Sequence, residues 1–201
     1  MLLVLASIRR PAAVVVLGTL AACAGRRQTT PAPSAPSTAV VPDSSPPAHP
    51  TTRPAPASVD WLTVDSATHT ASLTLEVTAP PNSPSAQISG FRAGAARIMV
   101  PLGWKVQWTW RNADPTSLHS LVVMVQREKI PLEGGRPAFS NAMTRMVTEG
   151  LTTGQIDRTT FEAEEPGWYW LLCGVPGHAL KGEWIELRVD PEAATARVEA
   201  R

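Results

Sequence analysis

Three residues with metal-binding side chains lie close together near the C-terminus of the chain. Cys173 and His178 are separated by four residues, and four more separate His178 from Glu183. Pro176 and Gly177 favour a tight turn between the first two, so a thiolate, an imidazole and a carboxylate can converge on one ion. The spacing therefore predicts a metal site on one short loop.

A second imidazole is available from a distant part of the sequence. His119 lies at the start of an apolar run, 118–124, which we expect to form a strand that holds the imidazole rigidly. Two imidazoles, one thiolate and a weak fourth ligand form the donor set of electron-transfer copper sites. His119, Cys173 and His178 therefore predict a site for one copper ion that alternates between Cu(I) and Cu(II).

Three other interpretations of these residues are possible. Cys173 could act as a nucleophile with a histidine as its base, but no oxyanion-binding motif is recognisable in the sequence. The chain could be a β-sandwich that has lost its metal, with Cys173 as a small core residue. Zinc could occupy the same donors as a contaminant. Three donors at such particular spacings argue against packing as their main role.

The other cysteine, Cys23, lies in a pattern typical of protein export. Arg9 and Arg10 precede a short apolar stretch at 11–22, well under the roughly 20 residues that span a bilayer as a helix. Leu-Ala-Ala directly before Cys23 resembles the bacterial lipobox. We therefore predict a lipoprotein signal peptide at 1–22 and a lipidated Cys23, which would anchor the exported protein on the periplasmic or extracytoplasmic face of a membrane. A plain secretory signal or an uncleaved anchor is the alternative.

If Cys23 carries lipid, Cys173 is the only remaining thiol, and no intramolecular disulfide can form. An unpaired cysteine in an exported protein needs a reason to persist. Metal ligation supplies one, because it holds the sulfur as a thiolate and protects it from oxidants.

The charge of the chain is unevenly distributed. Five of the 18 basic residues and one of the 17 acidic residues precede residue 60, so the remainder carries 13 basic and 16 acidic groups, a net charge of −3. This balance argues against nucleic acid as a partner. Nine of the 20 prolines fall between Pro31 and Pro56. We therefore predict a disordered, extended tether over 23–59.

Alternating apolar and polar residues indicate an all-β domain over 60–191, with a short C-terminal tail at 192–201. Trp104, Val106, Trp108 and Trp110 are expected on one buried face. One short helical insertion is predicted at 138–151, with Met143 and Met146 one helical turn apart; packing explains this pair better than metal ligation. The predicted strands are 71–78, 97–100, 104–110, 118–124, 159–162, 168–173 and 183–189.

Two segments carry a resemblance to a known family. The segment 112–122, with His119 and Ser120 opening an apolar strand, is similar to the first-ligand segment of cupredoxins. The segment 167–184, Gly-Trp-Tyr-Trp-Leu-Leu-Cys-Gly-Val-Pro-Gly-His-Ala-Leu-Lys-Gly-Glu-Trp, closely resembles the copper loop of the sulfocyanin family. The resemblance covers roughly residues 90–190. It implies a cupredoxin-like Greek-key β-sandwich or barrel.

The family resemblance also implies a function and a ligand set. Sulfocyanins are small blue-copper electron carriers attached to membranes and associated with respiratory chains. Carried over to this sequence, the resemblance makes His119, Cys173 and His178 the equatorial ligands and favours copper over zinc. Its implied partners are redox proteins of a membrane electron-transfer chain. We expect the apolar neighbours of His178, namely Pro176, Ala179 and Leu180, to form the docking surface for them.

Glu183 departs from the family pattern. In the pattern Cys-Gly-x-Pro-Gly-His-x-x-x-Gly-Met-Trp, methionine stands where this chain has Glu183, and no methionine follows Met146. Glu183 could bind copper through an oxygen and lower the reduction potential. It could instead turn outward toward Lys181 and leave a three-coordinate site. It could also shift the geometry toward a red copper centre like that of nitrosocyanin.

Electron transfer is therefore the predicted function, and the chain is expected not to be an enzyme. Two alternatives remain open from the sequence. A red copper centre with an open coordination position would make the protein an enzyme acting on a small nitrogen or oxygen species. A protein that holds or delivers copper would use the same donors without a redox task.

Overall fold

The computed structural model describes residues 56–57 and 59–201. The predicted signal peptide, the lipidated Cys23 and most of the predicted tether lie outside the described residues. Within the described part of the chain, no helix is long and apolar enough to cross a membrane.

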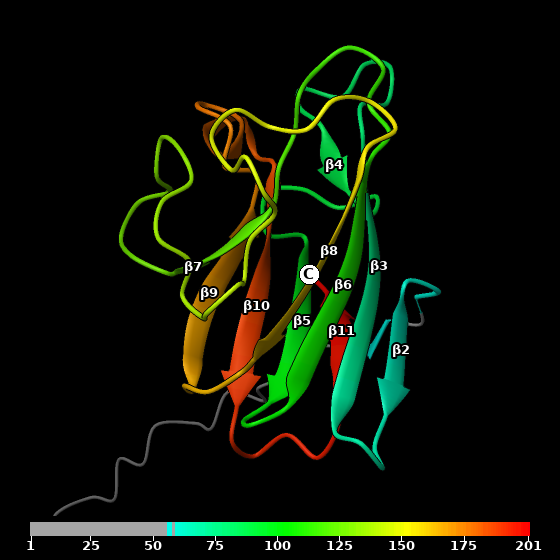
Figure 1. Ribbon diagram of the computed structural model, residues 1–201, viewed down its shortest axis with the longest axis vertical. Helices are drawn as coiled ribbons and strands as arrows, with labels where there is room; N and C mark the ends of the chain where they lie inside the picture. Colours follow the sequence, from blue (N-terminus) through cyan, green and yellow to red (C-terminus); the bar gives the residue numbers. More distant parts are fainter. Residues whose placement is uncertain (1–55, 58) are drawn as a thin grey trace, which may run out of the picture. The chain divides into compact units, whose positions relative to one another are not determined.

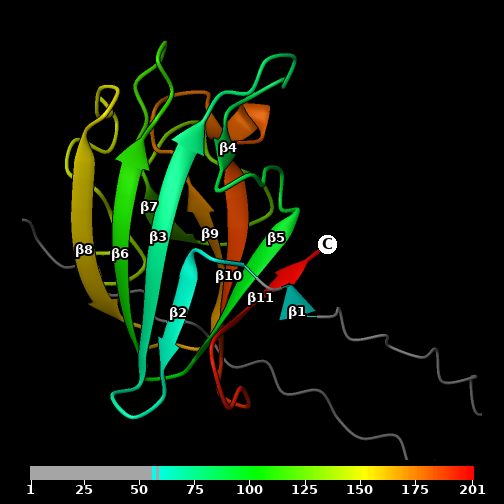
Figure 2. The ribbon, with the colours of Figure 1, turned by 90° about the vertical axis from the view of Figure 1, so that its right-hand side faces the viewer.

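The described residues form two β-sheets that face each other (Figures 1 and 2). The first sheet has the strand order β1-β11-β5-β10-β9-β7 and consists of β1 (Pro56–Ala57), β11 (Arg197–Ala200), β5 (Ala96–Pro101), β10 (Trp184–Asp190), β9 (Gly167–Leu172) and β7 (Val122–Val125). The second has the order β2-β3-β6-β8, with β4 paired to β3, and consists of β2 (Leu62–Asp65), β3 (Thr70–Thr78), β6 (Lys105–Asn112), β8 (Ile156–Glu162) and β4 (Gln87–Ile88). The β5–β10 and β3–β6 pairs are parallel. The predicted all-β sandwich is confirmed.

The core lies between the sheets and follows the alternation seen in the sequence. In β6 every second residue is buried, so Val106, Trp108 and Trp110 point into the core. Trp104, just before the strand, is also buried, which confirms the predicted tryptophan face. Trp108 packs edge-to-face on Phe161 of β8 with ring centroids 5.5 Å apart. Burial of such large rings supplies much of the energy that holds the sheets together.

The predicted helix at 138–151 is wrong. This segment instead runs irregularly beside β7: the Val123 N–H donates to the Ala142 carbonyl, and the Thr144 N–H donates to the Leu121 carbonyl. Asn141 and Met146 have φ angles of 65° and 53°, outside the range of a right-handed helix. The one helical element among the described residues is a 3₁₀ turn, η1 (Ala179–Lys181).

The two ends of the folded region also differ from the prediction. Residues 192–201 are not a simple tail, because β11 pairs with β5 through 197–200. Pro56 and Ala57, expected in the tether, form β1 and pair with β11. Arg97 of β5 binds Glu186 of β10 and Glu199 of β11 at 2.8 and 3.3 Å. These largely buried ion pairs tie the C-terminal strand to the sheet.

Candidate metal centre

The loop between β9 and β10 brings the predicted donor residues to one end of the sandwich. Cys173 directly follows β9, and Glu183 directly precedes β10. The Cys173 N–H donates to the Glu183 carbonyl at 3.1 Å, so the two residues close the loop as an added rung of the β9–β10 ladder. His178 lies at the N-terminus of η1 between them. The strand pairing therefore fixes how three of the donors face one another.

Two glycines allow this loop to close. Gly174 approaches neighbouring segments so closely that a Cβ atom would lie 2.8 Å from the Val147 carbonyl oxygen. Gly182 ends η1 with φ at 107°, a left-handed conformation that residues with a side chain rarely adopt. Both positions therefore require glycine for the loop to close.

His119 reaches the site from a segment that joins β6 to β7. Its N–H and carbonyl pair with those of Leu151, with distances of 3.2 and 2.7 Å between nitrogen and oxygen atoms. The next residue, Ser120, directs its N–H at the Cys173 Sγ atom at 3.4 Å, and its hydroxyl accepts the Gly174 N–H at 2.9 Å. His119 and Cys173 are therefore positioned by one shared hydrogen-bond framework.

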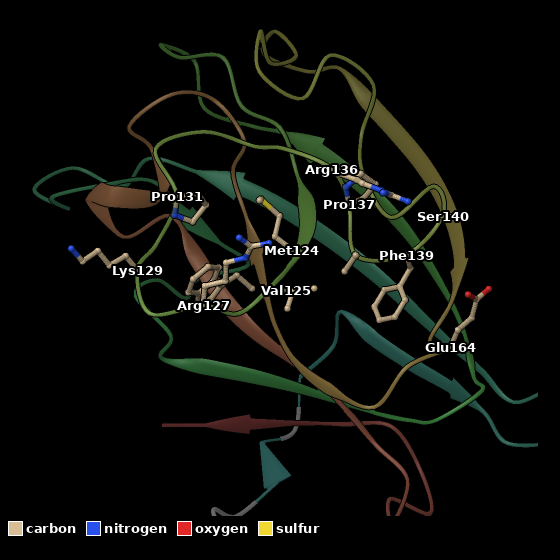
Figure 3. A pocket seen from close by; sticks show the side chains of 12 residues that line it. Met124, Val125, Arg127, Lys129, Pro131, Arg136, Pro137, Phe139, Ser140 and Glu164 are labelled. Atoms are coloured by element: carbon tan, nitrogen blue, oxygen red, sulfur yellow. The ribbon is translucent and has the colours of Figure 1, made fainter. Parts of the chain in front are cut away.

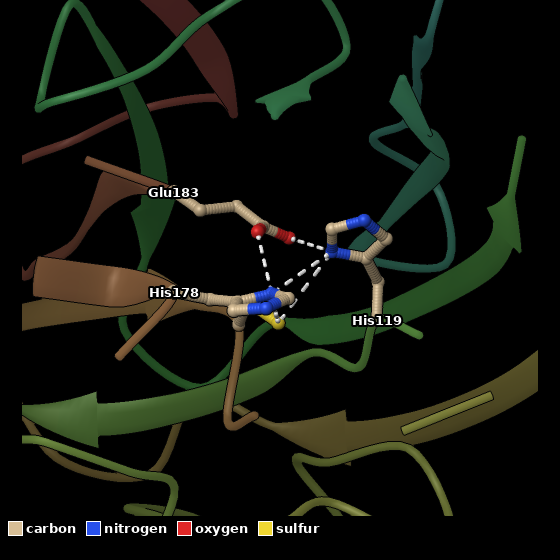
Figure 4. Close-up of side chains that lie close together, drawn as sticks. His119, His178 and Glu183 are labelled. Carbon is tan, nitrogen blue, oxygen red and sulfur yellow. Dashed lines mark hydrogen bonds and ion pairs between the residues drawn. The ribbon is translucent and has the colours of Figure 1, made fainter. Parts of the chain in front are cut away.

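The four predicted donors converge (Figure 4). One ligand atom from each of His119, Cys173, His178 and Glu183 lies within 4.8 Å of all the others. The two Nδ1 atoms are 3.3 Å apart, and Cys173 Sγ lies 3.6 Å from His178 Nδ1 and 3.9 Å from His119 Nδ1. Two nitrogens and a sulfur bound to one first-row metal ion lie about 3.3–3.9 Å apart. These distances fit a single ion.

Glu183 turns into the cluster. Its side chain is 2% exposed, with Oε1 2.8 Å from His119 Nδ1 and Oε2 3.2 Å from His178 Nδ1. Despite the short distance, Oε1 makes no hydrogen bond of good geometry with any described residue. The Glu183 oxygens and the two histidine Nδ1 atoms therefore face a common point rather than each other, which suits a metal site. The alternative in which Glu183 points outward toward Lys181 is wrong.

Charge interactions hold the donors together. Burial disfavours an imidazolium, but Glu183 and Asp114 outweigh it and raise the pKa of His119. Burial also disfavours a carboxylate, but the close imidazoles of His119 and His178 outweigh it and lower the pKa of Glu183. For Cys173, burial and the Glu183 charge both raise the pKa, so the thiol keeps its proton until a metal displaces it.

Asp114 was not predicted as part of the site. Its carboxylate is buried, and Oδ2 lies 2.8 Å from Nε2 of His119. The sequence Asn112-Ala-Asp-Pro115 has the composition of a turn, and this signal concealed the contact. The only hint in the sequence was the presence of a carboxylate five residues before a candidate ligand.

The predicted docking residues are only partly at the surface. Pro176 and Leu180 are exposed, and the Leu180 side chain is 57% exposed. The prediction that Ala179 belongs to the docking surface is wrong, because η1 turns this residue inward to pack with Leu172 and Trp170. Two further exposed leucines, Leu118 and Leu132, belong to neighbouring loops. The Leu132 carbonyl accepts the Gly177 N–H, so this residue adjoins the ligand loop.

Met143 and Met146 do not fill the core as expected. Their side chains are 39% and 55% exposed. Because the segment is not helical, the spacing that suggested a packed pair has no structural meaning.

Among the described residues, one cavity is lined by three of the four donors, and a larger one lies apart from them. The larger, about 810 Å³, lies beside β7 and is lined by Met124, Phe139 and Trp170, with three basic side chains, Arg127, Lys129 and Arg136, among its lining residues (Figure 3). It contains none of the four donors. The smaller, about 210 Å³, is lined by His119, His178, Glu183, Asp114, Lys181 and several serines. The second cavity therefore adjoins the donor cluster.

The stability of the metal-free protein should be greatest between about pH 4.5 and pH 6.5. The contribution of His119 is complete below its ordinary pKa of 6.5 and is lost as pH rises through its raised value. The contribution of Glu183 is complete above its ordinary pKa of 4.5 and is lost as pH falls through its lowered value. Urea unfolding across this range measures the effect.

The matched control for this prediction is His69, an exposed histidine that stacks on Trp104. His119→Ala should flatten the loss of stability above pH 6.5, whereas His69→Ala should leave this loss unchanged. A metal-free wild-type protein that gains stability steadily over this range would contradict the prediction.

One family model and several solved structures are similar to this chain. A family model described as the sulfocyanin (SoxE) domain matches residues 57–197. Among solved structures, reduced auracyanin from Roseiflexus castenholzii is similar, with 22% identity over 59% of this chain and 97% of that chain and a TM-score of 0.41. Rusticyanin from Thiobacillus ferrooxidans is similar with 20% identity over 61% and 82% of the two chains and a TM-score of 0.39. No curated protein matches the sequence significantly.

Proposed function

The chain belongs to the sulfocyanin family of cupredoxins, and from this premise we propose that it carries single electrons through one copper ion. His119, Cys173 and His178 would be the equatorial ligands, and Glu183 the fourth. The observation that carries the proposal is the convergence of these four side chains, within 4.8 Å of one another, at a site buried at one end of a rigid sandwich. Copper bound there would alternate between Cu(I) and Cu(II).

The surroundings of the donors suit electron transfer. His119 and Cys173 are held by paired backbone segments, so they need not move when the charge of the ion changes. The Ser120 N–H faces the Cys173 sulfur and would stabilise its negative charge. The His178 side chain, 20% exposed, provides the edge through which an electron could leave. A copper-delivery protein is less well supported, because Cys173 and Glu183 are both buried.

The visible and electron paramagnetic resonance spectra of the full chain loaded with Cu(II) test this proposal. A copper–thiolate centre of the carrier type should give an intense blue band and a small parallel hyperfine splitting. Zinc-loaded protein is the control, because a filled d shell gives no such band. A copper-loaded protein without any thiolate band would contradict the proposal.

The smaller cavity supports a second candidate function. Its lining includes three of the four donors, so a small ligand could reach the metal beside Glu183. A red copper centre with an open position could then act on a small nitrogen or oxygen species. Azide added to the Cu(II) protein distinguishes the two functions: a changed spectrum supports the enzyme, and an unchanged one supports the carrier.

We propose that redox partners dock on an apolar rim formed by Leu132, Pro176 and Leu180 around His178. Leu132 and Leu180 are 60% and 57% exposed, and both adjoin the ligand loop. Contiguous exposed apolar residues commonly mark interaction surfaces. Membrane redox proteins are the partners that the family suggests.

Leu180→Glu is expected to slow electron self-exchange about tenfold or more, because two like charges would meet across the contact between molecules. Line broadening in mixtures of reduced and oxidised protein measures this rate. Val125→Glu is the matched control, since Val125 is 52% exposed at the end of β7, beside the larger cavity. Equal slowing in both variants would exclude a specific role for the rim.

We further propose that a lipid on Cys23 anchors the protein to the outer side of a membrane, with residues after it as a tether. This proposal rests on the sequence pattern around Cys23. The mass of the mature N-terminal peptide tests it directly. An N-terminus other than a modified Cys23 would contradict it.

A further inference from the structure

A second carboxylate contacts the donor cluster from outside. Asp114 Oδ2 lies 2.8 Å from Nε2 of His119, and both side chains are 3% exposed or less. On the opposite side of the same ring, Nδ1 faces His178, Cys173 and Glu183. The two nitrogens of His119 therefore have different surroundings: one faces a carboxylate alone, and the other faces the site.

The two oxygens of Asp114 also have different tasks. Oδ1 accepts two hydrogen bonds from Thr116, from its N–H and its hydroxyl, both at 2.7 Å. The Asp114 N–H in turn donates to the Asn112 side chain, whose amide donates to the Leu151 carbonyl. Oδ1 thus holds the turn, and Oδ2 is left free for His119. The carboxylate is fixed before any metal binds.

A neutral imidazole carries one proton on one of its two nitrogens. Because Oδ2 can only accept a hydrogen bond when Asp114 is ionised, it selects the tautomer with the proton on Nε2. The lone pair then lies on Nδ1, which faces the other donors. A hydrogen bond from imidazole to carboxylate also makes the opposite nitrogen a stronger donor.

We infer that Asp114 is a positioning residue that fixes the tautomer and orientation of His119 and, through its charge, favours Cu(II) over Cu(I). This inference rests on the proposed copper site and adds a residue that does not touch the metal. A purely structural role is the alternative, in which the contacts of Oδ1 with Thr116 explain the burial of Asp114 by themselves.

Asp114→Asn separates the two roles. The asparagine oxygen can replace Oδ1 and keep the Thr116 contacts, but its NH₂ group then faces His119 Nε2. Two donors would oppose each other, so the imidazole must move or change to the wrong tautomer. We expect Cu(II) affinity to fall about 10- to 100-fold. If Cu(II) loses tenfold more affinity than Cu(I), the reduction potential rises by about 59 mV.

Thr116→Val is the matched control, because it removes the hydroxyl contact to Oδ1 and leaves Oδ2 unchanged. It should alter neither the copper affinity nor the potential. Competition with a chelator measures the affinity for Cu(II) alone, and redox titration of the full chain measures the potential. If Asp114→Asn matches the wild type in both, the inference is overturned.

The hydrogen bond between His119 and Asp114 provides a measurement that needs no variant. Proton and nitrogen NMR of the Cu(I)-loaded, ¹⁵N-histidine-labelled full chain should show the Nε2 proton of His119 shifted far downfield, because Asp114 Oδ2 lies 2.8 Å from Nε2. An Nε2 proton without this shift would overturn the inference even if Asp114→Asn does not fold. Failure of the proposed function looks different, because the wild-type Cu(II) protein would then lack a thiolate band.

Discussion

Cys173→Ser is expected to abolish the intense visible absorption of the copper-loaded protein. The band requires a thiolate bound to Cu(II), and Cys173 is the free cysteine among the described residues. A serine hydroxyl is a harder and far weaker donor, so copper affinity should also fall by several orders of magnitude. Absorption spectra at increasing Cu(II) concentration measure both effects.

Cys23→Ser is the matched control for this substitution, because it removes the chain's other thiol. It should leave the spectrum unchanged. Circular dichroism should show the same β-sheet content in Cys173→Ser as in the wild type, since serine differs little in size. A thiolate band that persists in Cys173→Ser and disappears in Cys23→Ser would exclude the site described above.

Glu183→Met is expected to raise the reduction potential by on the order of 100–200 mV. The buried carboxylate stabilises the ion with the higher charge, and a thioether carries no charge to do so. The blue colour should deepen as the fourth ligand weakens. Redox titration and absorption spectra measure the two changes.

The pH dependence of the potential provides a second test of Glu183. Protonation removes its negative charge and destabilises Cu(II), so the potential should rise as pH falls. Because a bound copper ion would favour the ionised carboxylate, this rise should occur below the ordinary pKa of Glu183, 4.5. Above that pH the contribution of Glu183 should be constant.

Glu183→Gln and Glu186→Gln serve as controls. The first keeps the shape of the side chain and removes its charge, so it should reproduce most of the rise in potential. The second removes the carboxylate of Glu186 on β10, which binds Arg97 of β5 away from the cluster. It should leave the potential unchanged. A Glu183→Met variant with the same reduction potential as the wild type would show that the carboxylate is not a ligand.

The convergence of four potential donors was predictable because most of its signals are local. Cys173, His178 and Glu183 lie within one loop, and the position of His119 at the start of an apolar run identified the fourth donor. The strands were likewise predictable wherever one face is buried, as in β6, because alternation of side chains records burial directly.

Features that depend on contacts between distant residues were not predictable. Asp114 resembles an ordinary turn residue until the fold brings it to His119. The strand β11 lacks a strong apolar pattern, because Glu199 is buried through ion pairs with Arg97 and Arg197 rather than through hydrophobic contact. The spacing of Met143 and Met146 suggested a helix, but pairing with the β7 segment overrode this local preference.

The rung between Cys173 and Glu183 has a consequence for how such a centre can evolve. The backbone hydrogen bond closes the ligand loop at its base, so the register of β9 and β10 does not depend on the side chain at position 183. A single codon change there can exchange a charged side chain for a neutral one while the sandwich remains the same. The fold can thus serve electron-transfer chains of different driving force without being rebuilt.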